Sequence, residues 1–421
     1  MEDTNIYVLG AGSIGCLFSY YLKKYNNNVI LITRDNNTKE SKNQETNFEK
    51  SLSVEFKYKS SEGKLIDNDT IQCLVKTPTQ ISNNNEKIKI LLITTKSPDT
   101  LEAIKTIESS LHSECTIILM QNGVLGTYSL LTEYFLTKNK HLNSPLPRIL
   151  VGTTSNGSYR ISPLNIVHAG KGTTYIGEPN GDYTTFYHEN NTGSDNLELI
   201  NHQFSPLQEL NITVYTEAKD YTLKLLPLLQ TKLIVNACLN PLTALFECLN
   251  GWIVDIIDTE SQTIKNINTK DHPCSSMIKE ICQEAAWVLV DDAKDKINND
   301  NNNRENDATQ NDQSFNFELP ISLKHLSEKA KSQAEEWEKS VIDVAKKTCL
   351  NRNSMLQDID AKRVTTEIEF LNGFLVKEAT KKYIRILQEH SVFETPNQPI
   401  LKVNEMLVRL IKIKSWIRSQ N

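Results

Sequence analysis

The pattern of apolar and polar positions gives the two halves of the chain different characters. In the first half, short apolar runs alternate with segments of helical periodicity, the first of which covers 16–25. Strands that alternate with helices predict a mostly parallel, doubly wound sheet. Six runs have the length of a buried strand: 5–9, 28–34, 88–95, 116–120, 149–154 and 173–176.

From about residue 218 the strand signals fade and longer helical patterns take over. They cover 221–246, 273–296, 322–348 and 361–391. The pattern therefore predicts an α/β protein with a Rossmann-type N-terminal domain at 1–215 and an all-α C-terminal domain at 216–421.

Polar segments interrupt this pattern, and we interpret them as surface insertions. Residues 180–203 contain scattered asparagine and glycine, and residues 35–50 and 60–70 surround a candidate strand pair. The asparagine-rich segment 297–314 has low complexity, which predicts disorder.

Composition narrows the class of protein. The chain has 421 residues, a formal net charge of -6, 38% hydrophobic and 23% charged residues, which is typical of a soluble globular protein. Without a basic excess we expect neither nucleic acid nor a membrane as partner. No secretory or Arg-rich leader is evident, and no uncharged apolar stretch reaches the ~18 residues of a membrane span. We expect a cytoplasmic protein, with the mitochondrion as the alternative.

Cysteine and histidine spacing argues against a metal centre or a disulfide framework. None of the eight cysteines forms a Cys-x-x-Cys pair, and most lie in apolar runs. The eight histidines show no paired ligand spacing either. We therefore expect reduced, buried thiols and no metal.

A glycine motif comes directly after the first predicted strand. Gly10-Ala11-Gly12-Ser13-Ile14-Gly15 matches G-x-G-x-x-G, opens a helix and precedes a second strand, as in a dinucleotide-binding unit. Gly10 would permit the tight turn, Gly12 would let the backbone approach a pyrophosphate, and Gly15 would let the helix pack closely. The helix N-terminus would offer its N–H groups to the phosphates.

The end of the second strand bears on the choice of dinucleotide. Arg34 lies 19 residues after Gly15, where NAD-preferring folds tend to have an acidic residue. An arginine suits a 2′-phosphate, so we favour NADPH/NADP+. Asp35 comes next and weakens the argument, and a solvated loop charge is the alternative.

One apolar segment carries a row of polar side chains. Lys232 is the only charged residue in 225–246, and Asn236 and Asn240 follow at helical spacing. The lysine either reaches the surface or is held in a pocket. Pro241 should end or kink the helix and could turn the row toward a cleft.

A glutamate lies on a second apolar stripe. In 366–376, Glu367 falls on the side of Leu371 and Phe374, whereas Glu369 points away. An unpaired carboxylate among apolar side chains is costly. Glu367 is therefore either a site carboxylate facing Lys232 or the substrate, or a glutamate at the edge of the stripe that reaches solvent.

Together these segments resemble the ketopantoate reductase (2-dehydropantoate 2-reductase) family, as a eukaryotic, fungal-like member with insertions. The matching segments extend from Asn5 to the last helices. They are the glycine motif, Thr95-Lys96, Asn122-Gly123-Val124, Lys232 to Ala244, Ser354 to Ile359, and Thr366 to Gly373. The resemblance implies a C-terminal domain similar to that of 6-phosphogluconate dehydrogenase.

The resemblance also implies roles for these residues. Lys232 would be the general acid and Glu367 the second catalytic residue, which binds the substrate hydroxyl and contacts the cofactor. Asn122 would lie between nicotinamide and substrate. The 2′-phosphate end would be held by Arg34 and Lys96, and the substrate would be bound by Asn236, Asn240 and Ser354.

The chain departs from the family pattern near Ser354. Glu367 lies 13 positions after Ser354, one more than is usual in the family, and Asn353 replaces a serine. In an unbroken helix one extra residue rotates all later side chains by about 100°. A turn near 362–366 would absorb it.

The implied reaction is NADPH-dependent reduction of 2-dehydropantoate to (R)-pantoate, which serves pantothenate and coenzyme A biosynthesis. A nearby ammonium would stabilise and protonate the oxygen as hydride adds to the ketone. One alternative is a related reductase of another 2-keto acid, and the other is a non-catalytic NADPH-binding relative. The apolar C-terminal helices could form a homodimer interface or pack within one chain.

Overall fold

The structure is a computed structural model. It describes residues 4–25, 27–34, 48–56, 68–142, 144, 146–190, 196–254, 273–290, 326–389 and 399–420. The chain divides into two compact units, Met1–Leu229 and Gln230–Asn421. This division falls later than the predicted start of the second domain at 216, because Leu225 and Leu229 are buried in the core of the first unit.

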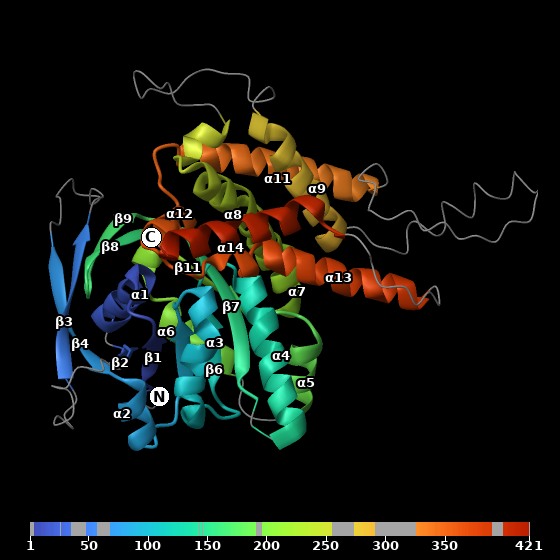
Figure 1. The fold of residues 1–421 in the computed structure, drawn as a ribbon. Coiled ribbons are helices and arrows are strands. Elements are labelled where there is room, and N and C mark those ends of the chain that lie inside the picture. Colours follow the sequence, from blue (N-terminus) through green and yellow to red (C-terminus); the bar gives the residue numbers. More distant parts are fainter. Residues whose placement is uncertain are drawn as a thin grey trace, which may run out of the picture. The chain divides into compact units, whose positions relative to one another are not determined.

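The first unit is built on one sheet of eleven strands, in the order β11-β10-β7-β6-β5-β1-β2-β4-β3-β9-β8 (Figure 1). Its central strands, β4-β2-β1-β5-β6-β7, are all parallel, which is the doubly wound order of a dinucleotide-binding fold. Their bounds are β1 (Ile6–Leu9), β2 (Val29–Ile32), β4 (Asp69–Lys76), β5 (Ile90–Ile93), β6 (Thr116–Leu119) and β7 (Arg148–Thr154).

Further strands extend both edges of this sheet. Strand β10 (Thr174–Gly177) pairs with β7 in the antiparallel direction and with the edge strand β11 (Ile212–Tyr215) in the parallel direction. Beyond β4 lie β3 (Phe48–Phe56), β9 (Asn165–Gly170) and β8 (Gly157–Ser162). The apolar pattern did not predict β8, β9 or β11. Strand β8 has no buried residue, so it lacks the apolar alternation by which a strand is recognised.

Helices cover both faces of the sheet. Ile6 and Val8 of β1 pack into a core with α1 (Ser13–Lys24) and α6 (Asn196–Phe204). Tyr7 and Leu9 point to the other face, which is covered by the remaining helices. These are α2 (Pro78–Asn83), α3 (Ser97–Thr106), α4 (Val124–Leu142), α5 (Asp182–Asn190) and the segment η4 (Tyr221–Leu225), with a short 3-10 turn at Glu108–Ser110. A second 3-10 turn, Gln208–Leu210, packs on the face of α1 through Leu210, and the short segment α7 (Ala218–Asp220) leads into η4 without a buried residue. Burial on both faces explains why the parallel strands are continuous apolar runs.

The segment 180–203 is not the irregular insertion that its polar composition suggested. It contains α5 and most of α6, although residues 191–195 lie outside the described chain. Tyr183 and Tyr187 of α5 are buried, as are Leu197 and Ile200 of α6. One apolar side per helix is enough to hold each on the sheet.

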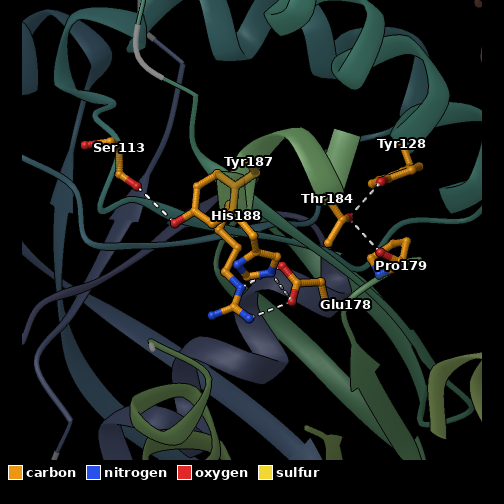
Figure 2. A network of polar contacts seen from close by, with 8 residues as sticks. Ser113, Tyr128, Glu178, Pro179, Thr184, Tyr187 and His188 are labelled. Atoms are coloured by element: carbon orange, nitrogen blue, oxygen red, sulfur yellow. Dashed lines mark hydrogen bonds and ion pairs between the residues drawn. The ribbon is translucent and has the colours of Figure 1, made fainter. Parts of the chain in front are cut away.

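Polar contacts fix α5 to the sheet (Figure 2). Arg148, at the start of β7, donates two hydrogen bonds to Glu178, at 2.7 and 2.6 Å, and is only 4% exposed. His188 lies 3.2 Å from the same carboxylate, and Tyr187 donates to the carbonyl of Ser113. This bidentate pair is the strong form of a charged hydrogen bond. It lies at the amino end of β7, opposite the edge at which the glycine turn lies.

The described part of the second unit contains only helices and turns. Helices α9 and α11 lie side by side (Figure 1). The elements are α8 (Leu226–Phe246), whose first turn still belongs to the first unit, η5 (Asn250–Val254), α9 (Pro273–Leu289), α11 (Glu328–Lys347), α12 (Ser354–Asp360), η8 (Glu367–Phe370), α13 (Asn372–Glu389) and α14 (Lys402–Gln420). The segment predicted to be disordered, 297–314, and most of 35–50 and 60–70 lie outside the described residues.

By length and composition, one helix in the described chain could cross a membrane, the continuous helix Ala218–Phe246. The core helix of a globular protein has the same properties, and Ile234, Ala237 and Cys238 in it are fully buried. All eight cysteines are free thiols, and six of them are buried.

Candidate active site

The glycine turn joins β1 to α1. Gly10 has a φ of +117°, which strongly favours glycine. A Cβ at Gly15 would lie 1.9 Å from the carbonyl oxygen of Gly10, so the helix packs directly on the turn. A Cβ at Gly12 would meet no atom within 4 Å, which leaves open space beside the N-terminus of α1. The turn therefore has room for a phosphate next to free helix N–H groups.

Arg34 and Lys96 lie at the same edge of the sheet. Arg34 follows β2 and donates to Asp99 at 2.7 Å, while Lys96 directly precedes α3, the helix that contains Asp99. The Arg34 side chain is 84% exposed, so this ion pair is weak and can rearrange. Sequence reasoning missed Asp99, because its pairing with Arg34 depends on the arrangement of strands. Asp35 lies outside the described residues.

Asn122 lies in the turn between β6 and α4. Its carbonyl accepts a hydrogen bond from the Ser97 hydroxyl at 2.5 Å, and Gly123 after it has a φ of 66°. Gln121 before it is buried, and its amide donates to Thr100 at 3.0 Å. The turn is thus fastened to α3, which places Asn122 at the carboxyl edge of the parallel strands, where such sheets bind ligands.

In the second unit, Lys232 lies on α8 with Asn236 and Asn240 following on the same helix. Lys232 and Asn236 are partly buried and Asn240 is buried. Burial lowers the pKa of the Lys232 ammonium to about 8, and the negative charge of Glu367 opposes this shift. A lysine with this pKa can donate a proton near neutral pH.

Glu367 belongs to the short 3-10 helix η8 and is only 6% exposed. Glu369, two residues later, is exposed and forms an ion pair with Lys412. The two glutamates therefore point to different environments, as the apolar stripe predicted, although the element is a 3-10 helix rather than part of a long α-helix. The structure places Glu367 in electrostatic contact with Lys232.

The segment 361–391 is not one helix. Helix α12 ends at Asp360, Lys362 has a φ of 56°, and the amide of Arg363 donates to the carbonyl of Asp358. This turn lies where we expected one to absorb the extra residue between Ser354 and Glu367. Because the chain is not helical there, the additional residue does not rotate Glu367 relative to Ser354 by a helical step.

Ser354 is the first residue of α12 and is partly buried. Asn353, which replaces the family's serine, caps this helix through a 3.0 Å bond from the amide of Leu356. Its own amide donates to the carbonyl of Leu239 on α8 at 3.4 Å. Asparagine is as good a cap as serine, so the replacement preserves the helix start that positions Ser354.

Pro241 does not end α8, although an end there was one of the two outcomes expected from sequence. The helix continues to Phe246. Proline cannot donate to the carbonyl of Ala237, the residue four positions earlier. Instead the side-chain amide of Asn372 donates to that oxygen at 3.0 Å. Sequence reasoning missed this role of Asn372, which lies inside the segment 366–373 that was already singled out.

Comparison with known proteins covers both units. The family model Ketopantoate reductase PanE/ApbA matches residues 6–181, and the model Ketopantoate reductase PanE/ApbA C terminal matches 225–388. A probable 2-dehydropantoate 2-reductase of Schizosaccharomyces pombe is 29% identical over 261 residues, 59% of this chain and 66% of that protein, slightly under two thirds of its length. The 2-dehydropantoate 2-reductase of Shigella flexneri is 27% identical over 308 residues, 72% of each chain.

A solved structure shares the fold over nearly the whole chain. D-mandelate dehydrogenase, determined with NADH and anilino(oxo)acetate, has a TM-score of 0.59 and 16% identity, and the match covers 99% of both chains.

Proposed function

Because the chain belongs to the ketopantoate reductase family, we propose that it reduces 2-dehydropantoate to (R)-pantoate with NADPH. Pantoate would then serve pantothenate and coenzyme A biosynthesis. The observation that carries the proposal is Lys232, held at a pKa of about 8 on an apolar helix in electrostatic contact with the buried Glu367.

The proposed reaction needs one hydride and one proton. NADPH supplies the hydride, which adds to the keto carbon. As the carbon–oxygen π bond breaks, its electron pair moves to the oxygen, and the Lys232 ammonium donates a proton there. The positive charge also stabilises the negative charge that develops on this oxygen. Solvent then returns a proton to Lys232.

The other predicted site residues would orient the substrate. Glu367 would accept a hydrogen bond from the substrate hydroxyl, and its charge keeps the pKa of Lys232 from falling further. Asn236 and Asn240 lie on the same helix as the lysine, and Ser354 starts a neighbouring helix. Fixing the ketone against the acid contributes to rate through orientation.

The residues of the first unit fit a dinucleotide. The open space beside Gly12 accepts a pyrophosphate at the N-terminus of α1. Arg34 and Lys96 would hold the adenosine 2′-phosphate, which supports NADPH over NADH. Arg34 would exchange its exposed contact with Asp99 for the phosphate. Asn122, at the carboxyl edge of the strands, would contact the nicotinamide end.

The proposal is tested by following NADPH oxidation with ketopantoate in the natural protein and in Lys232→Ala side by side. We expect rapid turnover, and a loss of at least about a hundredfold in kcat for the variant, because the general acid is removed. Circular dichroism and NADPH titration would show that the variant is folded and binds the cofactor. A folded, NADPH-binding natural protein without turnover would exclude ketopantoate as the substrate.

A reductase of another 2-keto acid is the second candidate. It is favoured by the shared fold of D-mandelate dehydrogenase, since mandelate is an aromatic 2-hydroxy acid. A panel of aliphatic and aromatic 2-keto acids separates the two, because the true substrate should have the highest kcat/KM by a wide margin. Tight NADPH binding without turnover of any keto acid would identify a non-catalytic relative.

We also propose a cytoplasmic location and a homodimer. The eight free thiols support a reducing compartment, and cell fractionation distinguishes cytosol from mitochondrion. An exposed apolar stripe on α14 supports self-association.

A further inference from the structure

A chain of buried polar side chains connects four helices of the second unit. Asn372, the first residue of α13, and Asn404 of α14 are both fully buried, and Glu284 of α9 is 5% exposed. The amide of Asn372 donates to Oδ1 of Asn404 at 2.9 Å. The amide of Asn404 in turn donates to Glu284 at 2.7 Å. The remaining N–H of Asn372 reaches α8.

The hydrogen bond to α8 meets a specific requirement of that helix. Pro241 has no N–H, so the carbonyl of Ala237 lacks its intrahelical donor. Asn372 supplies the missing hydrogen bond at 3.0 Å from a position 135 residues away. A buried carbonyl without a donor would cost free energy, so α8 continues through Pro241 with Asn372 as the replacement donor.

The groups at both ends of this row of hydrogen bonds are acceptors, which fixes how the two asparagine side chains are oriented. Glu284 accepts three hydrogen bonds, from the amides of Val403 and Asn404 and from the Asn404 side chain. Asn404 must therefore turn its oxygen toward Asn372. Asn372 must then present its NH₂ group to two acceptors, Oδ1 of Asn404 and the carbonyl of Ala237. Only a side chain with two donors at this point satisfies both.

Asn372 also lies next to the element that carries Glu367. Helix η8 ends at Phe370, and only Leu371 separates it from Asn372. Ile368, within η8, and Leu371, at this junction, are both buried. The bond from Asn372 to Ala237 therefore joins the segment of Glu367 to the helix of Lys232, between the positions of Asn236 and Asn240.

We propose that Asn372 is a positioning residue, whose hydrogen bond to the Ala237 carbonyl, left free by Pro241, holds η8 on α8 and keeps Glu367 facing Lys232. The proposal rests on the proposed function, because the pair matters for reduction of the ketone. It assigns Pro241 a complementary role, since an ordinary residue there would bond the carbonyl within the helix and weaken the need for Asn372.

Two substitutions separate positioning from mere stability. Asn372→Ala removes the bond between the segments and leaves the Ala237 carbonyl without a donor. Pro241→Ala restores an intrahelical donor for that carbonyl but does not reconnect the segments. We expect the double variant to regain part of the stability lost in Asn372→Ala, measured by urea unfolding, without regaining kcat. The regained part comes from the Ala237 carbonyl, whereas the buried Oδ1 of Asn404 still lacks its donor.

The first measurement is kcat with NADPH and ketopantoate for both single variants and the double variant. Asn372→Ala and the double variant should lose at least about tenfold in kcat, since small misplacements of catalytic groups have large effects. Pro241→Ala should retain the natural value. If the double variant regains kcat together with stability, Asn372 has only a structural role and the proposal is wrong.

The second measurement does not depend on turnover. The pH dependence of Lys232 acetylation, followed by mass spectrometry, reports its pKa. Because the charge of Glu367 raises this pKa, displacement of Glu367 should lower it by at least about half a unit in Asn372→Ala and in the double variant. An unchanged pKa in both would overturn the proposal, even if the protein proved inactive on ketopantoate.

Asn353→Ser provides a matched control. Asn353 also donates to a carbonyl of α8, that of Leu239, but lies before α12 rather than beside η8. Serine keeps the helix cap and removes this contact. The pKa of Lys232 should stay unchanged, and an equal shift in this control would show that any loss of contact with α8 has the same effect.

Discussion

At the residue scale, the environment of Lys232 decides its chemistry. An ordinary lysine has a pKa near 10.5 and is a poor acid at neutral pH, whereas burial lowers the pKa of Lys232 to about 8. Glu367 limits this effect. The two residues therefore set the pH range in which the acid is protonated yet able to transfer its proton.

The lowered pKa of Lys232 predicts how turnover depends on pH. Because the ammonium is the active form, kcat should be constant below the pKa and should fall as pH rises through about 8. In Glu367→Gln the charge that raises the pKa is removed, so the fall should begin at lower pH. Rates measured between pH 6 and 10 test both statements. A rate that rises with pH would show that Lys232 acts as a base instead.

Arg34 is the residue that we expect to determine the preference for NADPH over NADH. Arg34→Ala should raise the KM for NADPH by about tenfold or more and change the KM for NADH little, because only NADPH has the 2′-phosphate. Asp99→Asn, which removes the negative charge that pairs with Arg34 but keeps the guanidinium, is the control and should keep the preference for NADPH. Equal effects of Arg34→Ala on both cofactors would argue against a phosphate contact.

At the scale of elements, the glycine turn contains one glycine that the fold requires and another that only a bound ligand would require. Gly15 is needed by the fold, because a Cβ there would overlap the carbonyl of Gly10. Gly12 is not, because a Cβ there would enter open space. The same motif therefore contains positions with different physical reasons for glycine.

The matched pair Gly15→Ala and Gly12→Ala tests this difference. Gly15→Ala should lower the free energy of unfolding by at least about 1–3 kcal/mol, which is the usual cost of overpacking. Gly12→Ala should leave stability within about 1 kcal/mol and weaken NADPH binding, since the new methyl group occupies the phosphate space. Urea unfolding and fluorescence titration measure the two effects. Normal NADPH binding by a stable Gly12→Ala would place the pyrophosphate elsewhere.

At the scale of the whole molecule, α14 presents an apolar surface to solvent. Met406, Leu410, Ile413 and Ile417 recur at helical spacing and are 40–55% exposed, whereas Leu407 and Ile411 on the other side are buried. A continuous exposed apolar stripe is typical of an interaction surface. In the proposed homodimer a second copy of the chain would cover it.

Light scattering after gel filtration tests the homodimer. The expected mass is twice the 47.8 kDa of one chain. The double substitution Ile413→Glu and Ile417→Glu should give the monomer mass, because it places two charges on the stripe. Leu142→Glu changes an exposed apolar residue of the first unit and should leave the mass unchanged. A natural protein with the mass of one chain would exclude the dimer.

The sequence by itself determined the features that depend on neighbouring residues. The central parallel strands, the glycine turn, and the placement of Lys232, Asn236 and Asn240 on one helix come from patterns within about 30 residues. The apolar stripe also distinguished Glu367 from Glu369, although the local helix type differed. Periodicity and chain geometry are sufficient at this range.

Only the tertiary structure decided the features that depend on distant residues. The contact of Asp99 with Arg34, the addition of β8 and β9 to the sheet, and the continuation of α8 through Pro241 each need a partner from elsewhere in the chain. Proline in a helix predicts a break when only local donors are considered. Here a donor from 135 residues away replaces the missing bond, and such a pairing leaves no periodic signal in the sequence.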